Sequence, residues 1–104
     1  MMGGVELRER PELLAHRKAD SVAVAVQDVG PGRAVVAFLD SDQRTELTVG
    51  EAVPLGHKVA LVPMAKGDAV TEYGVTIGLA LSAIAPGAHV HVHNIGSARW
   101  PRRN

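Results

Sequence analysis

The chain has 104 residues, which leaves room for one domain with a modest hydrophobic core. Its 11 basic residues balance its 11 acidic ones, and this neutrality argues against a general nucleic-acid binder or a protein of anionic membrane surfaces. The absence of cysteine excludes disulfides, thiolate metal ligands and thiol nucleophiles. Because there is no signal segment and no apolar run long enough to span a bilayer, we expect a cytoplasmic protein.

The two ends of the chain are interpreted as flanking segments of one β-domain over residues 20–95. Residues 1–19 form a leader, and the apolar positions of Val5–His16 are compatible with a short helix that Pro11 interrupts. Residues 96–104 form a basic tail. The core is aliphatic, since 46% of the residues are hydrophobic and only 3% aromatic. Such a small core makes a homo-oligomer or a larger partner plausible.

Hydrophobic periodicity between the flanking segments favours strands. Residues 22–26 alternate between valine and small residues, and residues 44–49 alternate again after an apolar run at 34–39 and a turn cluster at 40–42. Residues 75–84 fit either a short helix or strands. Their β-branched residues and two glycines favour strands.

A heptapeptide recurs four times: an apolar residue, two others, glycine, two others, then valine. Glycine supplies the positive φ angle of a tight turn, and the apolar residues on both sides anchor that turn in the core. The four units are residues 29–35, 53–59, 64–70 and 84–90. Their uneven spacing argues against a solenoid and favours an all-β, barrel-like or clip-like fold.

The segment His89–Asn94 carries the densest set of potential ligands. If it is a strand, His89, His91 and His93 share one face and the intervening valines face the core. Neutral imidazoles suit Zn, Fe, Mn or Ni, although three residues along one strand splay and need ligands from elsewhere. Outward-facing polar positions of a half-buried strand are the alternative. Asn94 either extends the polar face or closes the strand.

Two other positions have candidate roles. His57 and Lys58 follow the glycine of one heptapeptide, where they either contact an acidic ligand or form a solvated turn. Tyr73, the only tyrosine, is either a packing residue with a hydrogen-bonded hydroxyl or a proton donor, and we expect it in the core. The sequence has no nucleophile elbow, phosphate loop or dinucleotide turn.

Residues between Asp20 and Asn94 resemble a known family. They resemble the small SAF-type domain that opens altronate and galactarate dehydratases and that serves as the small subunit of sulfolactate sulfo-lyase. The residues that carry the resemblance are Gly56-His57-Lys58-Val59-Ala60-Leu61, Gly67, Val70, Tyr73-Gly74, Ile77-Gly78, Ala80, Ile84, Gly87 and His89-Val90-His91-Val92-His93-Asn94. The resemblance implies a β-clip fold.

The resemblance also implies a sugar-acid context. The family removes water or sulfite from hydroxy acids in a reaction that depends on a divalent metal, usually Fe or Mn. His57 and Lys58 match the family's Gly-His-Lys turn, while His91, His93 and Asn94 match its closing His-x-His-Asn. These matches imply metal contacts for His91 and His93, with His89 as a further metal ligand. They imply substrate contacts for His57, Lys58 and Asn94.

Two functions follow as expectations. The first is a small accessory subunit of a sugar-acid hydro-lyase, which docks on a large metal-bearing catalytic subunit and lends His91 and His93 to a shared site. The second is a non-catalytic SAF-type module that binds a carbohydrate, a metal or a protein. One departure bears on the choice, because the family usually has lysine before Tyr-Gly and this chain has Glu72. No residue is assigned as the catalytic base or acid.

Overall fold

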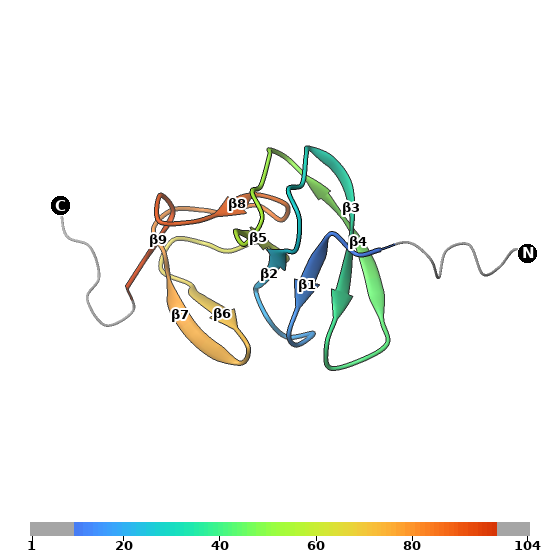
Figure 1. Cartoon of the computed structure of the whole chain (residues 1–104). Coiled ribbons are helices and arrows are strands. Elements are labelled where there is room, and N and C mark those ends of the chain that lie inside the picture. The colour runs from blue at the N-terminus through green and yellow to red at the C-terminus, as the bar shows by residue number, and fades with distance from the viewer. Residues whose placement is uncertain (1–9, 98–104) are drawn as a thin grey trace, which may run out of the picture.

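The computed structural model describes residues 10–97. This part of the chain folds into nine short strands without a helix (Figure 1). In chain order the strands are β1 (Leu13–Ala15), β2 (Val22–Ala25), β3 (Gly32–Phe38), β4 (Arg44–Val49), β5 (Lys58–Ala60), β6 (Ala69–Glu72), β7 (Val75–Ala80), β8 (His89–Val90) and β9 (Ile95–Gly96). None of these residues belongs to a helix that could cross a membrane. The all-β prediction is confirmed, and β7 confirms the choice of a strand after Val75.

The strands form two sheets. One has six strands in the order β4-β3-β1-β2-β5-β8, and the other has three in the order β6-β7-β9. In Figure 1 the three-stranded sheet lies on the left and the β1–β3–β4 part of the larger sheet on the right, with β2 and β5 between them. All pairings between strands are antiparallel except that of β1 with β3.

The four heptapeptides form the joints between these strands. Their glycines have the predicted positive φ angles: 124° at Gly32, 87° at Gly56, 91° at Gly67 and 86° at Gly87. In three units the residue after the glycine donates its N–H to the carbonyl three residues earlier, which closes a β-turn. The apolar first residues pair in two isolated bridges, Val29 with Val53 and Met64 with Ile84. The turns are therefore anchored in pairs.

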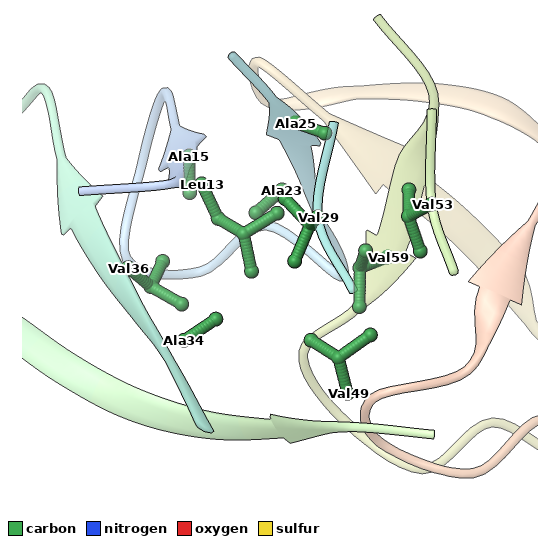
Figure 2. Close-up of a cluster of buried hydrophobic side chains, with 10 residues drawn as sticks. All are labelled: Leu13, Ala15, Ala23, Ala25, Val29, Ala34, Val36, Val49, Val53 and Val59. Carbon is green, nitrogen blue, oxygen red and sulfur yellow. The ribbon is translucent and has the colours of Figure 1, made fainter. Parts of the chain in front are cut away.

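The core consists of two aliphatic clusters. The first contains ten buried residues from β1 to β5 and their connections (Figure 2). The second is built around Val70, Ile84 and Val90 beneath the three-stranded sheet. Strand β5 joins the clusters, because successive side chains of a strand point to opposite faces. Val59 therefore packs in the first cluster and Ala60 in the second.

Strand β1 lies inside the segment interpreted as a leader. Leu13 is fully buried, and β1 occupies a central position between β2 and β3. The helix considered for this segment is absent from its described part, because burial of alternate residues and pairing on both edges favour an extended chain. The folded unit thus extends upstream of Asp20. Residues 1–9 and 98–104, which include most of the basic tail, lie outside the described residues.

Candidate functional site

The histidine-rich segment is a short strand followed by a turn. The prediction of a strand over His89–Asn94 is wrong beyond Val90, because β8 ends there and residues 91–94 turn back toward β9. Main-chain N–H groups of Asn94 and Ile95 both donate to the carbonyl of His91, at 3.0 and 3.1 Å. The histidines therefore do not share one face through strand alternation alone.

Asn94 holds this turn with its side chain. Its Oδ1 accepts a hydrogen bond from the backbone N–H of His91 at 2.9 Å. Its Nδ2 donates to the carbonyl of His89 at 2.8 Å. The residue is only 9% exposed. The amide predicted to contact substrate thus lies among backbone groups of its own turn.

His57 enters the cluster through the pairing of β5 with β8. Their antiparallel register pairs Lys58 with Val90, and continuing it by one residue places His57 opposite His91. The two rings are stacked with centroids 4.2 Å apart. His57 also contacts His89, with 2.8 Å between Nδ1 of His57 and Nε2 of His89. The sequence placed His57 in a separate turn, whereas the fold makes it a member of the histidine cluster.

Three imidazoles can therefore face one ion. One nitrogen from each of His57, His89 and His91 lies within 4.8 Å of those of the other two. Two nitrogen ligands of one tetrahedral zinc ion lie about 3.3 Å apart, since each Zn–N bond is about 2.0–2.1 Å. The three nitrogens lie within 4.8 Å of one another, and a shared ion would need the stacked rings to turn until their in-plane lone pairs converge on it. The ligands come from two paired segments rather than from one strand.

The lowered pKa of His89 favours its neutral form, in which imidazole binds metals. Burial lowers the pKa of His89, and a charge on neighbouring His57 lowers it further. His93 and His91 act in the same direction, whereas Glu51 opposes them. Glu51 also accepts a hydrogen bond from the backbone N–H of His89 at 3.3 Å. It is the carboxylate that the structure records at this edge of the cluster.

Two of the predicted residues lie outside the convergent set. The ring of His93 is tilted by 45° to that of His89 at a centroid distance of 5.4 Å, and His93 contributes no nitrogen to the group of three. Lys58 is the first residue of β5, and its Nζ lies 3.7 Å from Oε1 of Glu72. The other oxygen of Glu72 is 4.0 Å from Nε2 of His16. Lys58 is thus engaged by an internal carboxylate.

Tyr73 is not in the core. It is 61% exposed at the tip of the β6–β7 hairpin, where it has a φ angle of 59°. Asp20, only 2% exposed, accepts hydrogen bonds from the backbone N–H groups of Tyr73 at 2.7 Å and Gly74 at 3.0 Å. The Tyr73 ring stacks on His16 at 4.4 Å. The dipeptide Tyr-Gly between two apolar segments was the signal for this hairpin turn, which sequence reasoning missed.

Comparison with protein families agrees with this arrangement. The model of the altronate/galactarate dehydratase SAF domain matches residues 11–98. The chain belongs to this family. The match begins two residues before β1, in agreement with a folded unit that starts upstream of Asp20.

Curated relatives contain this unit in two settings. The chain is 35% identical over 91 residues to the α subunit of (2R)-sulfolactate sulfo-lyase from Chromohalobacter salexigens, covering 86% of this chain and 97% of that subunit. The corresponding subunit from Paracoccus pantotrophus is 42% identical over 66 residues, or 64% of this chain and 96% of the subunit. Altronate dehydratase from Escherichia coli is 47% identical over 75 residues, which are 72% of this chain but 14% of that enzyme. The same fold is a whole subunit in one case and a small part of an enzyme in the other.

Proposed function

We propose that this chain is a small accessory subunit of a hydro-lyase that acts on sugar acids or related hydroxy acids. The observation that carries the proposal is the match along 97% of a sulfo-lyase α subunit, together with a match to 14% of altronate dehydratase. A unit that is a subunit in one relative and a small part of another calls for a larger partner to supply the remaining site. That partner is a large catalytic subunit, and the complex works in the cytoplasm.

In this function the histidine cluster holds a divalent ion. His57, His89 and His91, which offer one nitrogen each within 4.8 Å of the others, would hold the ion, and Fe or Mn bound there would supply Lewis-acid chemistry for a departing hydroxyl or sulfite group. The chain's own residues bind and orient. His93 lies at the edge of the cluster, with its ring centroid 5.4 Å from that of His89. No residue of this chain is assigned as the base that removes the α-proton.

Substrate contacts by His57, Lys58 and Asn94 stay predictions in this scheme. His57 is better placed as a metal ligand, and the Asn94 amide is used within its turn. Lys58 can reach a substrate carboxylate only if it leaves Glu72. The cluster is therefore the part of this chain that most directly serves the reaction.

A metal titration tests this role first. Isothermal calorimetry with Mn²⁺, Fe²⁺ under anaerobic conditions and Zn²⁺ is expected to give one site per chain in the wild-type protein. His57→Ala and His91→Ala are expected to weaken binding, whereas His16→Ala, which removes a half-exposed imidazole outside the cluster, leaves it unchanged. Equal binding by all four proteins would rule out the cluster as the site.

An activity assay tests the subunit role. The chain is mixed with candidate large dehydratase-like subunits, and loss of water or release of sulfite from candidate hydroxy acids is followed. Activity that requires both proteins is expected. If no large subunit becomes active or binds, the accessory role is refuted.

The pairing of Lys58 with Glu72 favours one second candidate, a non-catalytic SAF-type module that binds a carbohydrate, a metal or a protein. In such a module Glu72 pairs with the ammonium group of Lys58, which an acidic substrate would otherwise bind. Metal binding without activity in any pairwise mixture is the outcome expected of this alternative.

A further inference from the structure

The Asn94 side chain bonds to the backbone of two of the three convergent histidines. Its Oδ1 accepts from the N–H of His91, and its Nδ2 donates to the carbonyl of His89. Both bonds are shorter than 3.0 Å and lie at a residue that is 9% exposed. One planar amide therefore fixes the backbone on either side of Val90, immediately where strand β8 gives way to the turn.

This position matters because a change of backbone direction moves an imidazole as a whole. An extended chain beyond Val90 would carry the following residues away from β7, whereas the turn brings Ile95 into its pairing with Ala80 of β7. Within the turn the ring planes of His89 and His91 lie at 12° to each other, and those of His57 and His91 at 16°. The stacked rings lie close together, and one nitrogen from each of the three lies within 4.8 Å of those of the other two.

We propose that Asn94 is a positioning residue that aims the His89 and His91 imidazoles at His57 by bonding to their backbone groups. This inference rests on the proposed function only for the ion that the imidazoles take. It assigns Asn94 no contact with substrate or metal. Removing a group that orients metal ligands through hydrogen bonds typically lowers metal affinity about 10- to 100-fold.

The test compares two variants of Asn94 with a matched control. Asn94→Ala removes both bonds, while Asn94→Asp keeps an acceptor for the His91 N–H and loses the donor to the His89 carbonyl. Ser21→Ala is the control, because Ser21 is also buried and accepts a hydrogen bond from a backbone N–H, that of Thr71, outside the histidine cluster.

Two readouts are used on the full chain. Zinc affinity is expected to fall about 10- to 100-fold in Asn94→Ala and less in Asn94→Asp, with an altered visible spectrum of the Co²⁺ form, and to stay unchanged in Ser21→Ala. In the metal-free protein, imidazole ¹⁵N resonances report the contact between His57 Nδ1 and His89 Nε2. Both Asn94 variants are expected to shift them, and Ser21→Ala is not.

The outcomes separate this inference from the proposed function. If wild-type protein binds no metal, the metal role fails, and the imidazole resonances still decide the role of Asn94. If Asn94→Ala does not fold, Asn94→Asp carries the test. Wild-type resonances in a folded Asn94 variant, together with wild-type zinc affinity wherever the wild type binds zinc, would overturn the inference.

Discussion

A methyl group added at Gly87 probes how tightly the turn units pack. A Cβ at this position would lie 1.9 Å from the carbonyl oxygen of Thr48, in the backbone of β4. Gly67 has a similar φ angle, 91° against 86°, but a Cβ there meets nothing within 4 Å. Gly67→Ala therefore isolates the cost of the left-handed conformation, about 1–2 kcal/mol. Gly87→Ala adds the cost of overpacking, about 1–3 kcal/mol, for a total of about 2–5 kcal/mol.

Urea unfolding followed by far-ultraviolet circular dichroism measures both losses. The two variants share the same change and the same type of turn, so their difference reports the contact with β4 alone. Gly87→Ala is expected to lower the midpoint more than Gly67→Ala at an unchanged slope. Equal losses in the two variants would show that the turn does not pack against Thr48 as the structure describes.

Three further predictions concern the hydrogen bonds that Asp20 accepts at the β6–β7 hairpin and the histidines. Asp20→Ala leaves three backbone N–H groups without their acceptor and is expected to lower the free energy of unfolding in urea by about 3 kcal/mol. Hydrogen exchange at Tyr73 and Gly74 should become faster, and unchanged exchange would contradict the stabilising role of Asp20. His93→Ala is expected to keep zinc affinity within a fewfold of wild type by calorimetry, and a loss as large as that of His57→Ala would place His93 among the ligands. Because the folded protein lowers the pKa of His89, the unfolded chain binds a proton more readily. The free energy of unfolding in metal-free buffer should therefore fall as pH is lowered through about 6.5, and His89→Gln should flatten this dependence; identical slopes in both proteins would refute it.

The turn units were predictable because their chemistry is local. Each unit has a glycine with an apolar residue three positions before it and a valine three positions after it. The glycine predicts the backbone conformation of the turn, and the two apolar residues predict how the turn is anchored. The structure confirms the positive φ angle at each predicted glycine and the burial of the flanking apolar residues. The alternating segments 22–26 and 44–49 also form strands, although β2 is buried on both faces and β4 buries only Val49.

The histidine cluster depends on features that a linear pattern does not contain. His57 joins His91 only through the register of β5 with β8, two strands separated by 28 residues that include β6 and β7. The end of β8 at Val90 depends on an Asn94 amide that bonds backward across the turn. Period-two alternation predicted neighbours along one strand, and the actual neighbours lie across two.

Tyr73 shows a different limit. Its scarcity suggested a core role, but the turn preceding Val75 requires two residues with positive φ angles, and Tyr73 and Gly74 occupy both positions. A left-handed conformation for tyrosine costs free energy, which the bonds from Asp20 offset. Turn geometry therefore placed the ring at the surface before any packing preference applied.

Two of the clustered histidines lie in the glycine turns that connect the strands, and this position matters for docking to a larger partner. His57 belongs to the turn unit 53–59 and His89 to the unit 84–90, and these two units are joined directly by the pairing of β5 with β8. Their glycine turns lean on neighbouring strands, since the N–H of Gly56 bonds to Ala25 and that of Gly87 to Ala60, both at 2.8 Å. The imidazoles of His57 and His89 thus belong to hydrogen-bonded turns whose flanking valines are buried. In the proposed function, a partner that docks here would meet imidazoles whose backbone is already ordered, so little of its binding free energy would be spent on ordering it.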